Sequence, residues 1–365
     1  MAALSSRLAC KVVAAAALAA LLCAGAADGA AIRDGLALQQ GAEVQHGASD
    51  TTSGSFASDL QGRASPATAG PATARPIKPL PLDDGTIRLA VKDWCAGKVS
   101  KANAVTKHGE IEDWDVSRVT DMAYLFAAIK NCNPNISKWS TGRVSDMSYM
   151  FDEARLFNQD IGAWDTANVT AMAYMFHQEY DYAYKDPDNV RPYAFNRAIG
   201  RWNTAKVETM EGMFSGADRF NQPLGSWTTA RVTDMKFMFR AANAFNQAIG
   251  KWNTAKVETM EGMFSGAERF NQPIGSWSTA KVQSFGSMFF QASAFNQAIG
   301  KWNTAKLLFR ATFAGASAFN QKLCWNRNQY WNTHEATFAN SGCPTTDAGQ
   351  SCWGVRAKDG KGACI

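Results

Sequence analysis

Cysteine is absent from the middle of this chain, and histidines and long apolar runs are scarce. No cysteine lies between Cys132 and Cys324, and only four histidines occur among 365 residues. Neither a Cys-x-x-Cys pair nor a His-Glu-x-x-His motif is present, so the spacings that usually hold zinc are missing. Beyond residue 27 no stretch is apolar enough to span a bilayer. We therefore expect no metal, no cofactor and no transmembrane segment once the leader is removed.

The first 27 residues have the features of a secretory signal peptide. Arg7 and Lys11 form a short positive region, residues 12–23 are an apolar run of mostly Ala and Leu, and residues 24–26 are small. A membrane anchor is the alternative, but the run is shorter than the roughly 20 residues that cross a bilayer. The sequence therefore predicts a secreted or cell-surface protein.

Six cysteines remain after the signal peptide, which suits an exported, disulfide-bonded chain. They lie near the two ends of the folded region, so we expect local pairs: Cys95–Cys132, Cys324–Cys343 and Cys352–Cys364. Residues 28–80, rich in Ala, Ser, Thr, Gly and Pro, cannot bury enough surface to fold and are expected to form a disordered linker. The net charge of +5 favours anionic partners only weakly, and no nucleic-acid partner is expected.

A tryptophan recurs every 25 residues over most of the remaining chain. The recurrence is interrupted once, by 13 extra residues between the third and fourth of these positions: Trp114, Trp139, Trp164, Trp202, Trp227, Trp252, Trp277 and Trp302. A period in this range is typical of a solenoid, in which each unit buries its apolar residues against its neighbours. We assign the solenoid to residues 114–345, an N-terminal cap to 81–113 and a Cys-containing tail to 346–365.

One unit, 245–267, illustrates the expected local structure. Ile249 and Trp252 lie in a short extended segment, whereas Val257, Met260, Met263, Phe264 and Ala267 have the spacing of one helix face. Thr254 stands where a helix N-cap belongs. The sequence therefore predicts a short strand or extended rung plus a short helix in each unit, with the units stacked into a right-handed, leucine-rich-repeat-like solenoid.

The pattern also predicts columns of equivalent residues inside the stack. Phenylalanines should form one column and tryptophans another, while the asparagine after each phenylalanine should be buried and should bind backbone groups at a bend. That asparagine recurs at Asn158, Asn196, Asn221, Asn246, Asn271, Asn296 and Asn320. Seven equivalent asparagines indicate a structural role rather than an active site.

The repeat Phe-Asn-Gln-x-Ile-x-x-Trp-[Asp/Asn]-Thr-x-x-Val-x-x-Met-x-x-Met-Phe is met by residues 270–289 except at Ser278, which stands at the Asp/Asn position, and at Phe285, which replaces the first Met. On these residues the chain resembles the BspA-like leucine-rich-repeat surface proteins, in particular the mycoplasma-type repeat of unknown function that also occurs in algae and other protists. Residues 90–95 and 111–116 resemble the N-terminal cap of algal members. The resemblance covers about residues 85–345 and implies a surface solenoid that acts in adhesion or ligand binding, with no catalytic residues to transfer.

A basic column is the first candidate binding site. Seven of the eight residues four positions after each tryptophan are basic, namely Arg118, Arg143, Lys206, Arg231, Lys256, Lys281 and Lys306, and Asn168 is the exception. In a stack these charges would lie within a Debye length of one another, about 8 Å at physiological salt, and could hold a linear polyanion such as an acidic polysaccharide. The alternative is local pairing with Asp121, Asp146, Asp234, Glu208 or Glu258 on a solvated face.

The 13-residue insertion falls within residues 177–191 and is the second candidate. Tyr180, Tyr182 and Tyr184 lie beside carboxylates there, as in many recognition loops. Calcium binding by Asp186, Asp188 and Glu179 is an alternative that lacks the EF-hand pattern, and an indifferent surface loop is another. Asn135 and Asn168 begin glycosylation sequons.

Nearly identical units favour binding over catalysis, because catalysis needs a few unique polar groups held in one place. Residues 201–225 and 251–275 differ at only three positions. We therefore expect a binding or adhesion protein for a protein or glycan ligand, and no enzyme. A self-assembling wall or matrix component is the alternative, and a glycan-active enzyme would require paired carboxylates at one site.

Overall fold

The structure is a computed structural model that describes residues 81–179, 193–304, 309–323, 325 and 337–343, and the backbone of 345–346 and 349–350. All of these residues belong to one compact unit, Ala74–Ile365. The predicted signal peptide, the 28–80 linker and most of the C-terminal tail lie outside the described residues.

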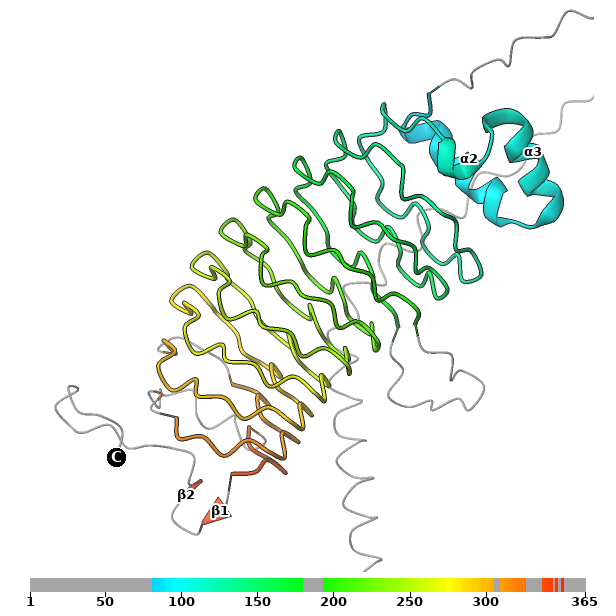
Figure 1. Cartoon of the computed structure of the whole chain (residues 1–365). Helices are drawn as coiled ribbons and strands as arrows, with labels where there is room; N and C mark the ends of the chain where they lie inside the picture. Colours follow the sequence, from blue (N-terminus) through cyan, green and yellow to red (C-terminus); the bar gives the residue numbers. More distant parts are fainter. Residues whose placement is uncertain are drawn as a thin grey trace, which may run out of the picture. The chain divides into compact units, whose positions relative to one another are not determined.

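In the part of the chain that the structure describes, two helices precede the repeated units. Helix α2 spans Asp84–Cys95 and helix α3 spans Lys98–His108, and the short 3-10 helix η2, Ile111–Asp113, follows (Figure 1). Asp83 and Thr86 form a capping box at the start of α2, which satisfies two of the otherwise free N–H groups there. Four residues of α2 point into the core: Ile87, Ala90, Val91 and Trp94.

The helices are fastened to the first repeated unit by polar and covalent contacts. The Asp84 carboxylate accepts hydrogen bonds from the backbone N–H groups of Thr120 and Asp121, at 2.7 and 3.0 Å. Cys95, at the end of α2, forms a disulfide with Cys132, so this predicted pair is confirmed. Trp94 packs edge-on against Trp114 with ring centroids 5.9 Å apart. The helices therefore cover the open end of the first unit, as a capping element should.

Beyond η2 the chain forms similar coils that lie side by side along the molecule (Figure 1). One position in each coil makes a parallel bridge to the same position in the next coil, at Asp121, Asp146, Ala171, Thr209, Asp234, Thr259 and Ser284. We call the edge of the stack that carries this position and the eight residues after it the bridged edge. Two short strands in the described residues, β1 (Thr345–Thr346) and β2 (Gly349–Gln350), form an antiparallel pair after the coils. The right-handed, leucine-rich-repeat-like class stays a prediction.

The prediction of a short helix in each coil is wrong for the coils that the structure describes. Within 257–267, Thr259 makes a bridge and residues 261–266 form consecutive turns instead. Met260 N–H donates to Ser284 O of the next coil, and Met263 N–H donates to Met260 O, a three-residue spacing rather than the four of an α-helix. Gly262 between them has φ 58°, which permits the turn. Turns of three residues also direct every third side chain inward, so this apolar spacing did not distinguish them from a helix.

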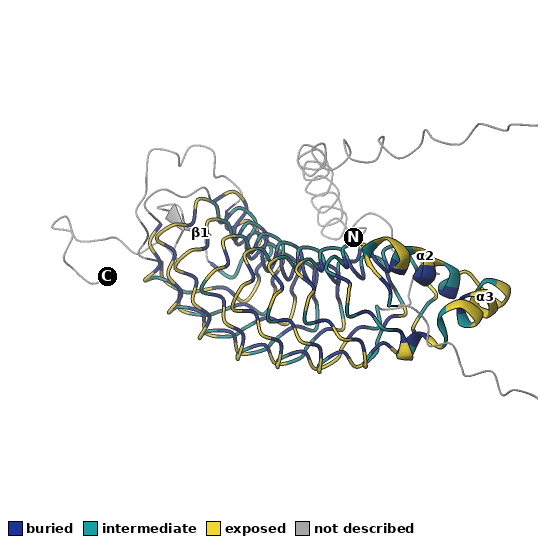
Figure 2. Cartoon of the chain, turned by 90° about the horizontal axis from the view of Figure 1, so that it is seen from above, coloured by how far each residue is buried: buried dark blue, intermediate teal, exposed yellow. Residues whose placement is uncertain are grey.

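The expected aromatic columns are confirmed. Trp227, Trp252 and Trp277 stack in adjacent coils with ring centroids 6.3–6.4 Å apart. The Trp252 indole N–H donates to Leu224 O at 3.0 Å, so its one polar group is satisfied inside the core. Phe239 and Phe245 stack at 3.9 Å within one coil, and each stacks on its equivalents in the neighbouring coils. Figure 2 shows this buried interior in dark blue along the coils.

Hydrogen bonds between coils run along two polar columns. Thr254, expected as an N-cap, is instead buried and donates its hydroxyl to Ser278 O of the next coil at 2.9 Å. The asparagine column binds backbone as predicted: Asn246 Oδ1 accepts from Asn271 N–H at 3.0 Å and from Gln272 Nε2 at 2.9 Å. These asparagines are half-buried or exposed, so the expectation of burial was wrong. Within a stack, backbone N–H groups at a bend can be satisfied at the edge of the core.

Candidate binding surfaces

The basic column is exposed in every coil where the structure describes it. Six of its seven cations lie in described coils, and all six are exposed: Arg118, Arg143, Lys206, Arg231, Lys256 and Lys281. Lys306 lies outside the described residues. Asn168, the neutral member, is exposed too and accepts a hydrogen bond from Lys206 Nζ at 2.6 Å. The stack therefore brings together side chains that are 25 or 38 residues apart in the sequence.

Three of the carboxylates that could pair with these cations, Asp121, Asp146 and Asp234, bind elsewhere. Asp121 forms an ion pair with Arg88 at 3.0 Å. Asp146 and Asp234 each accept a backbone N–H two residues later, at 2.7 and 2.8 Å. Among the described residues the one ion pair of the column joins Arg231 to Glu208 at 4.0 Å. In this part of the chain Arg118, Arg143, Lys256 and Lys281 have no acidic partner within 4.0 Å.

The two sequon asparagines are exposed, as glycosylation acceptors must be. Asn135 Nδ2 donates to Glu112 Oε2 at 2.9 Å, and Asn168 Nδ2 donates to Gly142 O at 2.7 Å. Their use stays a prediction.

Only the margins of the insertion are described. Tyr180, Tyr182, Tyr184, Asp186 and Asp188 lie outside the described residues. At the margin, the His177 ring contacts Asp152 through Nδ1 at 2.7 Å. Tyr193 donates to the backbone oxygen of Glu179 at 3.4 Å, so the two margins of the insertion lie close together.

A third surface, which the sequence reasoning missed, is a row of tyrosines on the bridged edge. Tyr124, Tyr149 and Tyr174 come from successive coils, and their rings stack nearly parallel with centroids 4.6 and 4.9 Å apart. We call these three residues the tyrosine ladder. Tyr124 is 56% exposed, and the other two are half-buried. The signal was visible as a tyrosine immediately before the Met-Phe or Leu-Phe pair in three successive units.

The ladder occupies a strained backbone position. Its residues have φ values of 61°, 58° and 54°, a region that bulky L-residues rarely adopt. Coils further along the stack have glycine there, at Gly212 and Gly262. Glycine satisfies the turn without strain, so the turn alone does not require tyrosine. Retention of strain of about 1–3 kcal/mol per residue is typical of functional positions, although ring stacking returns about 0.5–1.5 kcal/mol per pair.

Carboxylates provide the electrostatic surroundings of the ladder. The pKa of Tyr149 is raised to about 12, first by burial, then by Tyr124, and then by the carboxylates of Glu211 and Asp152. The pKa of Tyr174 is also raised, first by burial and then by Glu211, whose Oε1 accepts the Tyr174 hydroxyl at 2.9 Å. Burial raises the pKa of Glu211 in turn. None of the charges that shift these two tyrosines is a cation.

The equivalent position in a later coil is Phe237, and there two cations of the chain lie over the ring. Lys236 Nζ lies 5.0 Å from the Phe237 ring centroid, and the Arg240 guanidinium carbon lies 5.5 Å from it. Both distances are within the range of cation–π interactions. The bridged edge therefore presents an aromatic ring with carboxylates in its first coils and an aromatic ring with cations in a later coil.

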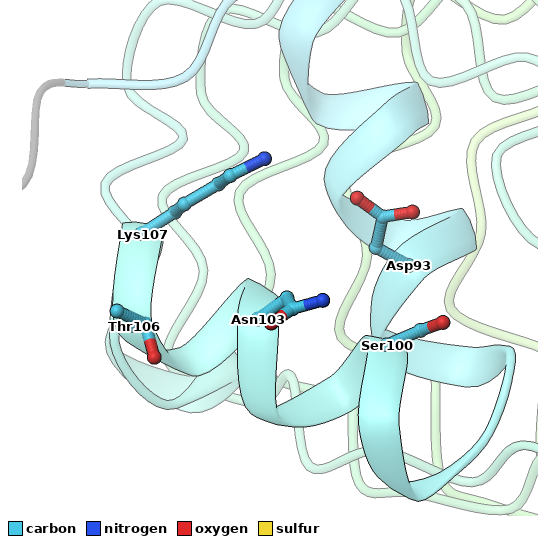
Figure 3. A pocket seen from close by; sticks show the side chains of 5 residues that line it. All are labelled: Asp93, Ser100, Asn103, Thr106 and Lys107. Atoms are coloured by element: carbon cyan, nitrogen blue, oxygen red, sulfur yellow. The ribbon is translucent and has the colours of Figure 1, made fainter.

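A small pocket between α2 and α3 is a weaker candidate. It has a volume of about 240 Å³ and is lined by Asp93, Ser100, Asn103, Thr106 and Lys107 (Figure 3). Its lining is polar and it is wide open, unlike the mostly apolar clefts that enclose small ligands. Across the described ranges, no group of three or more His, Cys, Asp or Glu residues is placed to hold a metal ion. Nor is any helix there long and apolar enough to cross a bilayer.

The comparisons with known proteins identify a repeat family. A family model described as "Mycoplasma protein of unknown function, DUF285" matches residues 96–191, 189–261, 224–325 and 245–348. Together the matches extend over residues 96–348, more than two-thirds of the 365 residues. Their overlap agrees with the repeated units in the sequence. No curated protein and no solved structure matches the chain.

Proposed function

Since the chain belongs to this family, the Mycoplasma proteins of unknown function DUF285, we propose a function from its own surface: it binds a linear polyanion along the basic column. We further propose that the protein is a secreted or cell-surface solenoid of the BspA-like, leucine-rich-repeat type, and that it is not an enzyme. The leader of 27 residues and the Cys95–Cys132 disulfide support export, because disulfides persist in oxidising compartments.

The observation that carries the binding proposal is the row of six exposed cations in the described coils, of which Arg231 alone has an acidic partner within 4.0 Å. Adjacent coils are close: the Trp252 and Trp277 rings are 6.3 Å apart. This spacing of the coils is shorter than one Debye length, about 8 Å at physiological salt, so repulsion between cations on adjacent coils is only partly screened. An anionic polymer that follows the row would relieve the repulsion at several coils at once. A small anion would relieve it at one.

A second set of cations in the same coils provides a matched control. Arg201, Lys251 and Lys301 stand immediately before the tryptophans of their coils and are exposed. They alternate with serines at Ser226 and Ser276, so they form no continuous row. Together these three residues carry the same charge as three members of the basic column.

The test is retention of the full chain on heparin and alginate columns with a salt gradient. The variant K206Q/K256Q/K281Q should elute at clearly lower salt and bind about tenfold more weakly, at about 0.5 kcal/mol per exposed contact. The control R201Q/K251Q/K301Q should elute nearly as the wild type does. Equal shifts in both variants would show that only net charge matters. Unchanged elution of the first variant would refute the proposal.

A further inference from the structure

We propose that the tyrosine ladder, with the carboxylates around it, is a docking surface for a cationic segment of a partner protein, one rich in lysine or arginine. This surface is separate from the basic column and would take a ligand of opposite charge. It does not depend on the polyanion proposal.

The first step in the argument is the internal comparison with Phe237. At that ring the chain supplies its own cations, Lys236 one residue before and Arg240 three residues after. The same two positions around Tyr124 are occupied by Ala123 and Ala127. An aromatic ring at this turn therefore can bind cations at these two positions. In the coil of Tyr124 both positions have short, uncharged side chains instead.

The next two coils also lack a lysine or arginine at these two positions. Around Tyr149 the two positions are Ser148 and Asp152, and around Tyr174 they are Ala173 and His177. Asp152 and His177 contact each other at 2.7 Å. No lysine or arginine stands at any of the six positions that flank the ladder.

The charge around the ladder also favours a cation. Asp152 and Asp146 both raise the pKa of Tyr124, after burial, and Glu211 acts on Tyr149 and Tyr174. Asp146 and Asp152 come from the coil of Tyr149, and Glu211 comes from the coil that follows that of Tyr174. A lysine or arginine of a partner would meet aromatic carbon, phenolic oxygen and carboxylate together, a combination that attracts organic cations.

The cations of the chain nearest the ladder are already engaged. Arg88 pairs with Asp121 at 3.0 Å and donates to the backbone oxygen of Ala123. Arg155 lies 3.8 Å from Glu153 and its guanidinium is 5.6 Å from the Tyr193 ring. The surface is open to a cation from outside at Tyr124, which is 56% exposed.

A macromolecular partner fits better than a free small cation. The ladder extends over three coils and has half-buried and exposed members rather than an enclosing cavity. Tyrosine is enriched among the residues that dominate protein–protein binding energy, because its ring provides large contact area with little side-chain freedom to lose. A basic segment can contact all three coils at once.

The test measures binding of fluorescein-labelled decalysine to the full chain by fluorescence anisotropy. The variant Y124G/Y149G should weaken binding at least tenfold, and it should fold because glycine occupies the same turn position at Gly212 and Gly262. The control F237G removes an aromatic ring from the same position where the chain supplies its own cations, and should leave decalysine binding unchanged. Circular dichroism of both variants verifies the fold.

A second variant, D146N/D152N, keeps the ladder and removes two carboxylates. It should weaken decalysine binding about fivefold while retention on heparin stays the same or increases. Equal losses in Y124G/Y149G and F237G would overturn the proposal, as would decalysine binding that neither ladder variant changes. Loss of heparin retention in K206Q/K256Q/K281Q with unchanged decalysine binding would separate this surface from the basic column.

Discussion

The first coils of the stack, up to residue 179, and the coils from residue 193 onward share an interior and differ at the bridged edge. Phe151 stacks on Phe176 at 5.5 Å in the first group, and Phe239 stacks on Phe264 at 5.7 Å in the second. At the bridged edge, the first group carries the tyrosine ladder, whereas the second carries glycines and Phe237 with its cations. Close packing fixes the interior of every coil, because each side chain must fit those of two neighbours. The edge meets this condition only in part, so side chains for binding can differ there.

The largest effect is expected from a substitution in the shared interior. Trp252 is 3% exposed and stacks on two neighbouring tryptophans. Trp252→Ala should lower the free energy of unfolding by about 3–5 kcal/mol, through the lost contacts and the cavity left behind. Urea unfolding followed by circular dichroism measures it. A loss below about 1 kcal/mol would mean that the coils do not depend on this column.

A smaller effect is expected where the interior meets the bridged edge, at Gly262. A Cβ there would lie 2.4 Å from two Phe237 ring atoms, and the backbone has φ +58°. Gly262→Ala should therefore destabilise the chain by about 2 kcal/mol, from backbone strain and the clash. Since the clash involves Phe237, the loss should be smaller in a Phe237→Ala background. A double-mutant cycle in thermal unfolding tests this coupling, and strict additivity would contradict the proposed clash.

The polar contacts between coils should contribute less. Thr254→Val keeps the shape of the side chain and removes its hydroxyl, which leaves Ser278 O without the donor at 2.9 Å. We expect a loss of about 1–2 kcal/mol, the usual penalty for an unsatisfied buried group. Thr254→Ser keeps the hydroxyl and should lose less. Chemical unfolding of both variants distinguishes a hydrogen bond from simple packing, which predicts the opposite order.

The smallest effect should appear in the pH dependence of stability at Glu211. Burial raises the pKa of this carboxyl in the folded state, so the folded state binds its proton more tightly than the unfolded state does. Glu211 therefore opposes folding increasingly as the pH rises from about 4, its unfolded pKa, through the raised value. Glu211→Gln should stabilise the chain at pH 7 by a few tenths of a kcal/mol, since the site is partly exposed. Thermal unfolding at pH 4 and 7 should show this gain only at pH 7, and an equal gain at both would contradict the assignment.

Much of the architecture could be predicted from period alone. The 25-residue recurrence predicted the aromatic columns and the asparagine contacts, and the position of Cys95 beside the first unit predicted its disulfide with Cys132. These predictions succeeded because stacking places equivalent residues next to each other whatever path the chain takes within a coil. The path itself was predicted wrongly, since apolar residues three apart point inward from successive turns as well as from a helix.

The candidate sites show a similar division. Recurrence was sufficient to find the basic column. It could not predict how few of these cations have acidic partners, because Asp146 and Asp234 bind backbone N–H groups instead. The tyrosine ladder has the same period. The sequence did not reveal it as a surface, because tyrosines among apolar residues are usually assigned to the core. Only the turn geometry places them at positive φ on the bridged edge.

The sequence by itself determined that equivalent residues lie in columns, because a strict repeat leaves each unit only its neighbours to pack against. Tertiary structure alone decided that the asparagines lie at the edge of the core, how the backbone turns between the columns, and which charges find partners. These depend on hydrogen bonds between coils, such as that from Gly262 N–H to Gly286 O at 2.8 Å. Such bonds compete with the four-residue bonds of a helix, and the spacing of side chains does not reveal which of the two prevails.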